Sequence, residues 1–155
     1  MSIVSIHVTE EPGGPVKSIP QVRAVAGQGL EGDRNFLAAG STRTKAGREV
    51  TLIEAEAIDA LERDYGIKIA PGEARRNLVT RGVALNHLVG REFRIGEAVL
   101  VGRRLCEPCG HLENLTGFKL RTGLIHRGGL RADILQGGLI QVGQPVEADS
   151  NVTPR

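Results

Sequence analysis

Short apolar stretches with polar neighbours recur along the chain and predict many brief β-strands. The first covers residues 3–8, where Val4, Ile6 and Val8 alternate with polar positions and are expected to share one face. Residues 16–20 are expected to be extended or to form a turn. Further strands are predicted at residues 22–25, 50–53, 78–80, 93–95, 98–101, 130–135, 139–142 and at Val146. The pattern therefore predicts seven to nine short strands.

One segment has the spacing of a helix. Within residues 54–65, Ile58, Leu61 and Tyr65 recur at intervals of three and four, and Gly66 follows as a stop signal. Gly96-Glu97 predicts a hairpin between its flanking strands, and Gln136-Gly137-Gly138 predicts a second one. A mainly β fold, a barrel or a sandwich, around one main α-helix follows from this pattern.

Composition narrows the functional classes. The 155 residues predict a single domain over residues 1–150 and a flexible tail at 151–155, and the 21 glycines fit many tight turns. No apolar run approaches the roughly 18 residues that cross a bilayer, and no basic, apolar leader opens the chain, so a cytoplasmic protein without a membrane partner is expected. A net charge of +2 and 3% aromatic residues give no reason to expect a nucleic-acid partner.

The only two cysteines, Cys106 and Cys109, lie three positions apart, with Pro108 between them and His111 shortly after. A thiolate is both a soft metal ligand and a nucleophile, so chemistry is expected here. Three other interpretations stay open. The cysteines are small buried hydrophobic residues, or they bind zinc together with His111 and His126, or they form a redox dithiol.

Basic residues offer a further possibility, because many of them lie in or beside predicted turns. If several converge with the thiols, their guanidinium groups would bind a phosphate or carboxylate and would favour the thiolate. The polar, basic segment 37–49 is expected to be a mobile loop over such a site. The residues concerned are Lys17, Arg34, Arg75, Arg76, Arg103, Arg104, Arg127 and Arg131.

Six short motifs, taken in order, resemble the MOSC domain. They are Val-Lys-Ser at 16–18, Gly-Asp-Arg at 32–34, Arg-x-Asn at 75–77, Cys-x-Pro-Cys at 106–109, His-Arg-Gly-Gly at 126–129 and Gly-Gly-Leu-Ile-x-Val-Gly at 137–143. That domain occurs at the C-terminus of molybdenum-cofactor sulfurases, in amidoxime-reducing components and as small stand-alone bacterial proteins. The resemblance runs from about Ile3 to Val146. It implies a closed or partly open β-barrel with one main α-helix and a few short helices.

The resemblance also implies roles for individual residues. Cys109 matches the cysteine that ligates molybdenum in the reductases and is thought to carry sulfur in the sulfurases. The pterin and the phosphate of the molybdenum cofactor would be held by Lys17, Ser18, Arg34, Arg75 and Asn77. Two departures stand out: Gly143-Gln144 replaces the usual Gly-Asp, and residues 41–48 lack the Asp-Thr-Ser type of contact seen in the reductases.

The implied function is to bind the molybdenum cofactor (molybdopterin) or to carry sulfur as a cysteine persulfide. Whether the role is sulfur transfer or a component of a molybdenum-dependent reductase acting on N-oxygenated substrates stays open. The implied partners are a molybdoenzyme, a cysteine desulfurase or an electron-transfer protein. The chain offers no room for a pyridoxal-phosphate site, so it is not expected to mobilise sulfur from cysteine by itself.

Overall fold

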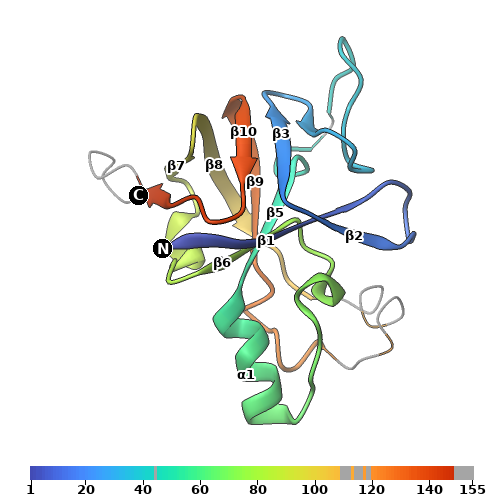
Figure 1. Cartoon of the computed structure of the whole chain (residues 1–155), viewed down its shortest axis with the longest axis vertical. Coiled ribbons are helices and arrows are strands. Elements are labelled where there is room, and N and C mark those ends of the chain that lie inside the picture. Colours follow the sequence, from blue (N-terminus) through green and yellow to red (C-terminus); the bar gives the residue numbers. More distant parts are fainter. Residues whose placement is uncertain (44, 109–112, 114–116, 118–119, 149–155) are drawn as a thin grey trace.

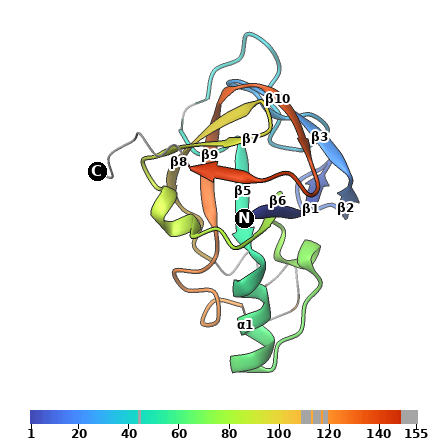
Figure 2. The same ribbon diagram turned by 60° about the vertical axis from the view of Figure 1, so that its left-hand side comes forward.

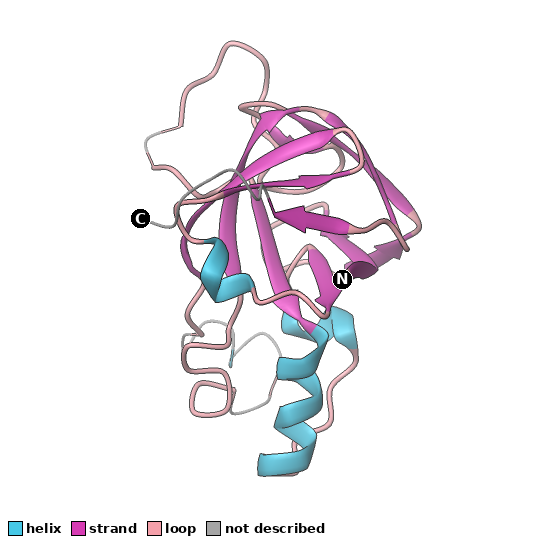
Figure 3. Ribbon diagram, turned by 90° about the vertical axis from the view of Figure 1, so that its left-hand side faces the viewer, coloured by secondary structure: helices cyan, strands magenta, loops and turns pink. Residues whose placement is uncertain are grey.

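The computed structural model describes residues 1–43, 45–108, 113, 117 and 120–148. These residues form a mainly β fold, in which the strands gather at one end and the main helix extends from the other (Figure 1, Figure 3). No helix in the described part of the chain is long and apolar enough to span a membrane. The predicted tail at 151–155 lies outside the described residues.

Two sheets make up the strand-rich end. The larger sheet runs in the order β11 (Val146–Ala148), β7 (Glu92–Ile95), β8 (Ala98–Leu105), β9 (Leu130–Gln136), β5 (Val50–Glu54), β6 (Leu78–Arg81), β1 (Ser2–Thr9) and β2 (Val16–Ile19). The smaller one has the order β10 (Gly138–Gln141), β3 (Gln21–Val25) and β4 (Gly29–Leu30). The described residues thus form eleven strands, more than predicted, because strands as short as β4 leave no pattern in the sequence.

The larger sheet curls until its two ends nearly meet. The start of β1, the seventh strand in the order, contacts the segment that leads into the opposite edge strand β11. The N–H of Ile3 donates to the carbonyl of Gln144 at 2.9 Å, and the N–H of Val146 donates to the carbonyl of Met1 at 3.0 Å. No described strand pairs with the outer side of β2, so among the described residues the sheet stays open there, as expected for a partly open barrel. The predicted fold class is confirmed.

In the first strand, the residues that face the core differ in part from those predicted. A bulge between Ile3 and Ser5, opposite β6, shifts the alternation by one residue. Ile3 is therefore buried and Val4 is exposed, whereas Ile6 and Val8 face the core as predicted. His7, on the other face of the strand, is also buried.

The second predicted hairpin is wrong. β9 pairs with β5 and β8, whereas β10 pairs with β3 in the other sheet. The chain crosses between the sheets at Gly137, where an added Cβ would lie 2.7 Å from the carbonyl oxygen of Ala24. The two glycines therefore mark a close crossing rather than a hairpin turn. The first predicted hairpin, β7–β8, is confirmed.

The predicted helix is α1 (Ala55–Tyr65), and it ends at Gly66, which has φ of 66°. Its apolar side packs on the outside of the barrel through Ile58 and Leu61, against Ile53 of β5 and Val79 of β6. Figure 2 shows α1 continuing directly from the lower end of β5. Of two short 3₁₀ helices, η1 (Pro71–Ala74) packs against β1, β2 and α1, and η2 (Leu85–Leu88) packs against β5, β8 and β9.

The Gly128-Gly129 pair packs the loop before β9 against two other segments. A Cβ on Gly128 would lie 2.2 Å from the carbonyl oxygen of Cys106, and one on Gly129 would lie 2.0 Å from that of Leu52. Gly129 also has φ of 114°, and its carbonyl accepts the N–H of Cys106 at 2.7 Å. These contacts require backbone without side chains, so both glycines position the cysteine segment.

We predict that Gly129→Ala lowers the free energy of unfolding by about 3 kcal/mol or more, because backbone strain and a steric clash combine. Gly90→Ala is the matched control, because Gly90 has φ of 77° with nothing within 4 Å of its added Cβ. Gly90→Ala should lower the free energy of unfolding by about 1 kcal/mol, from backbone strain alone. Urea unfolding monitored by circular dichroism measures both, and equal losses would contradict the proposed packing role.

Candidate functional site

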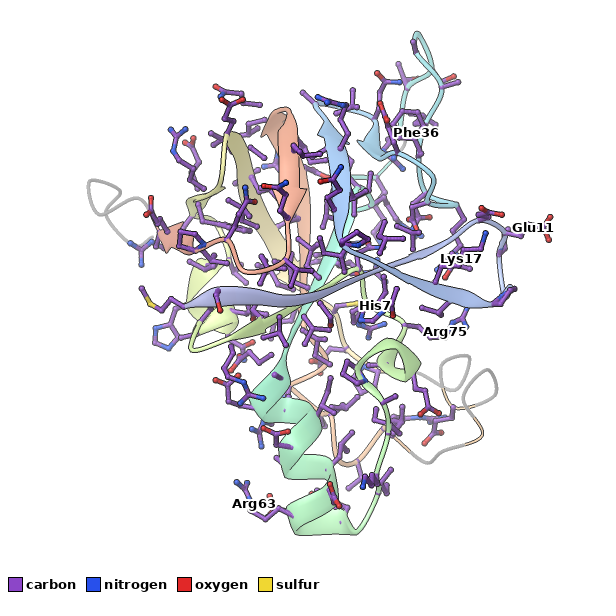
Figure 4. The ribbon with its side chains drawn as sticks, in the orientation of Figure 1. His7, Glu11, Lys17, Phe36, Arg63 and Arg75 are labelled. Atoms are coloured by element: carbon purple, nitrogen blue, oxygen red, sulfur yellow. The ribbon has the colours of Figure 1, made fainter. Side chains whose placement is uncertain are left out.

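A cavity of about 520 Å³ opens between the β1–β2 hairpin and η1. Val16 and Pro71 provide apolar surface, and Ser5, His7, Ser18, Glu73 and Arg75 provide polar groups. Figure 4 shows His7 and Arg75 close together beneath the hairpin. We call this space the His7 cavity. Its size and mixed lining suit a small organic ligand.

His7 is held between two serine hydroxyl groups. Its Nε2 lies 2.8 Å from Oγ of Ser5, and its Nδ1 lies 3.0 Å from Oγ of Ser18. Burial lowers the pKa of His7, which favours the neutral ring. A neutral imidazole has one donor and one acceptor, so one serine donates to it and the other accepts from it. His7 therefore orients Ser18, one of the predicted cofactor-binding residues. The sequence pattern did not single out His7 itself as part of the site.

A second, narrower space of about 50 Å³ adjoins the first, and His7, Val16 and Arg75 line both. Four arginines line it: Arg34, Arg75, Arg76 and Arg131. We call it the arginine cavity. Burial and the neighbouring positive charge of Arg34 lower the pKa of Arg75, although a guanidinium stays protonated at neutral pH. Guanidinium groups gathered in this way favour an anionic ligand.

The carboxylate of Asp33 beside this cavity is already engaged in fixing the backbone. It accepts the N–H of Thr9 at 3.0 Å and that of Asn35 at 3.3 Å. The N–H of Arg34 in turn donates to the carbonyl of Thr9 at 2.7 Å. The predicted Gly-Asp-Arg turn is therefore attached to the end of β1, and this attachment places Arg34 at the cavity.

Asn77 also lines the arginine cavity, but its side chain is bound within the protein. Its Nδ2 donates to the carbonyl of His7 at 3.0 Å, and its Oδ1 accepts the N–H of Thr51 at 3.0 Å. It thereby joins the segment before β6 to β1 and β5. The structure thus gives Asn77 a role in aligning the strands that carry His7 and Thr51.

The buried Arg76 connects the arginine cavity with the cysteine segment. Its Nε donates to the carbonyl of Gly128 at 2.8 Å, and its Nη2 donates to that of Cys106 at 3.3 Å. Cys106 is itself buried, with 1% of its surface exposed. The arginines and the cysteine segment, about 30 residues apart in sequence, therefore meet at one place.

Two predicted residues have a different status. Lys17 does not line either cavity, and its Nζ pairs with Glu10 at 2.7 Å toward the tip of the hairpin (Figure 4). Cys109 lies outside the described residues, as does His111. The predicted metal ligand therefore stays a prediction, although its neighbour Pro108 packs beside Gly128.

The zinc interpretation also depends on residues outside the described part. Within the described residues, no group of three or more His, Cys, Asp or Glu side chains is placed to share a metal ion. His126 lies next to Glu107, with 3.3 Å between Nδ1 and Oε2, and its side chain is largely exposed.

Comparison with known proteins identifies what the chain resembles. A family model described as the MOSC domain matches residues 39–147, which is most of the chain. No curated protein sequence matches the chain.

Solved structures share the fold at low sequence identity. The YuaD protein from Bacillus subtilis is 17% identical, with a TM-score of 0.77 over 95% of this chain and 94% of that one. YiiM from Geobacillus stearothermophilus is 17% identical, with a TM-score of 0.71 over 96% of this chain and 75% of that one. YiiM from Escherichia coli is 22% identical, with a TM-score of 0.65 over 99% of this chain and 72% of that one.

We predict that the contribution of His7 to stability is lost as the pH falls below about 6.5, the ordinary pKa of histidine. In the folded state the pKa of His7 is lower than this value, so the unfolded chain takes up a proton first. The stabilisation is complete above the unfolded pKa and is lost as the pH drops towards the folded one. Urea unfolding at pH 7.5 and pH 5 measures the difference.

His7→Gln removes this titration and should make the pH dependence shallower. His87→Gln, at an exposed position on η2, is the control and should keep the slope of the original protein. Equal slopes for His7→Gln and the original protein would show that His7 contributes no pH dependence.

Proposed function

This chain belongs to the MOSC domain family, and from that premise we propose that it binds the molybdenum cofactor across the His7 and arginine cavities. The family is linked to functions that involve this cofactor, a pterin dithiolene that bears a phosphate. We further propose Cys109 as the thiolate that ligates the metal or carries a persulfide sulfur.

One observation carries the proposal: Arg76 lines the arginine cavity and also donates a hydrogen bond to the carbonyl of Cys106. A ligand whose phosphate reaches the arginines can therefore extend towards the segment that leads into Cys109. The adjoining His7 cavity supports the pterin assignment, because its 520 Å³ and mixed lining accommodate a flat heterocycle with polar edges. The residues present fit the group.

The chain's own residues would then divide the work. Arg34, Arg75 and Arg131 bind the phosphate, and an anion there relieves the repulsion between Arg34 and Arg75. Ser18 and His7 offer a hydroxyl and a ring nitrogen to the pterin edge. Lys17 joins them only if it exchanges Glu10 for the ligand. The bound cofactor would supply a redox-active metal suited to a soft thiolate ligand.

The sulfur-carrier role and the reductase role use the same residues, and both belong to this proposal. As a carrier, the Cys109 thiolate would take the outer sulfur of a donor persulfide and release the donor's thiolate. A cysteine desulfurase and a molybdoenzyme would be the donor and the acceptor. In the reductase role an electron-transfer protein would be the partner.

We predict that protein purified from cells grown with molybdate contains molybdenum and extractable pterin, measured by mass spectrometry and by fluorescence of the oxidised pterin. Cys109→Ala should lose most of the molybdenum, because the metal loses its thiolate ligand. Cys106→Ala should retain it, because Cys106 is buried and contributes backbone contacts. Repeated absence of both metal and pterin from the original protein would contradict cofactor binding and leave sulfur carriage to be tested by persulfide labelling.

Alkylation gives a test that needs no cofactor. We predict that iodoacetamide modifies Cys109 faster than Cys106 in the folded protein, because only 1% of Cys106 is exposed. Peptide mapping by mass spectrometry after brief labelling measures the two rates. Equal rates, or a preference for Cys106, would contradict Cys109 as the reactive thiolate.

A further inference from the structure

A second group of arginines lies next to the arginine cavity. Arg104 on β8 is the direct cross-strand partner of Arg131 on β9. Directly opposed residues of an antiparallel pair project from the same face, with Cβ atoms about 5 Å apart. Two like charges in this arrangement destabilise the sheet unless something compensates for them.

The loop before β5 adds a third arginine. Its Gly47 lies over the pair, where an added Cβ would be 2.7 Å from Nη1 of Arg104 and 3.3 Å from Cβ of Arg131. Arg104 donates from Nη1 to the carbonyl of Ala46 at 2.5 Å. The following residue, Arg48, is exposed, and its charge acts on Arg104. Residues 46–47 of this segment thus lie over the two strands.

The described carboxylates nearest this group accept hydrogen bonds from other residues. The nearby Asp133 already accepts from Nε of Arg103 at 2.9 Å and from the N–H of Gly47 at 2.9 Å. Glu49, also buried, accepts the N–H of Ile134 at 3.2 Å. Burial and the charges of Arg131 and Arg48 lower the pKa of Arg104, and Cys106 and then Asp133 offset this only in part. Among the described residues, Arg48, Arg104 and Arg131 form no ion pair.

Arg131 belongs to both groups, because its side chain also lines the arginine cavity with Arg34, Arg75 and Arg76. The positive charge therefore extends from the cavity to Arg104 on β8, and Arg48 in the loop before β5 is near enough for its charge to act on Arg104. This is more cationic surface than a single phosphate monoester engages through its few acceptor oxygens.

We propose that Arg48, Arg104 and Arg131 form a second anion site beside the arginine cavity, and that the form of the ligand bound across both bears a diphosphate ester rather than the single phosphate of the proposed cofactor. Arg131 binds between the two phosphoryl groups, with Arg34 and Arg75 on one side and Arg48 and Arg104 on the other. The identity of the ligand as a pterin rests on the proposed function, whereas the second anion site rests on the arginines alone.

Inorganic phosphate and pyrophosphate test this inference by isothermal titration calorimetry on the whole protein, without divalent cations and at one ionic strength. We expect pyrophosphate to bind at least tenfold more tightly than phosphate. Arg48→Gln and Arg104→Gln should each remove most of that preference and change phosphate affinity less than twofold. Arg48 is exposed, so its variant tests the site even if Arg104→Gln disturbs the sheet.

Two control variants separate the possible outcomes. Arg63→Gln makes the same charge change at the far end of α1, where Arg63 pairs with Asp64, and should leave both affinities unchanged (Figure 4). Arg34→Gln should weaken the binding of both anions. An equal effect of Arg48→Gln and Arg63→Gln, or phosphate binding without preference for pyrophosphate, would overturn this inference alone. Failure of the original protein to bind either anion would contradict the proposed function as well.

Discussion

The arrangement of the site depends on the hydrogen bonds that the buried guanidinium of Arg76 donates to two backbone carbonyls. A buried cation is stable only when its donors find acceptors, and Arg76 finds them in the carbonyls of Gly128 and Cys106. These two acceptors lie in segments that have no regular secondary structure. The side chain therefore holds Cys106 and the loop before β9 in place, and it does so from the wall of the arginine cavity.

The same region uses backbone contacts where side chains would not fit. Gly128 and Gly129 approach the carbonyls of Cys106 and Leu52 so closely that any Cβ would collide with them. Asn77 joins β1 to β5 through its amide, and Asp33 attaches the Arg34 turn to the end of β1. Asn77, which the sequence predicts to bind the cofactor, and Asp33 of the Gly-Asp-Arg motif therefore form hydrogen bonds that align the strands. The groups left for a ligand in the arginine cavity are mainly guanidiniums, which favour an anionic ligand.

Several features followed directly from the sequence. The strand and helix patterns predicted the mainly β class, the helix that ends at Gly66 and the hairpin β7–β8, because each depends on local periodicity and turn residues. The motif order indicated the MOSC family, which the family model confirms. It also selected Arg34, Arg75 and Ser18, and the structure places these three around adjoining cavities.

Other features were decided only by tertiary structure. The bulge in β1 reversed the exposure of Ile3 and Val4, and β10 joined the other sheet instead of pairing with β9, because distant partners set both outcomes. The sequence did not identify His7 as a site residue, because a single histidine in a predicted strand has no distinctive pattern. Its role depends on its contacts with Ser5 and Ser18 and on the cavity that it lines. The sequence determined which elements form and which residues can bind anions. Convergence of these residues depended on contacts between segments far apart in the chain, which local patterns do not encode.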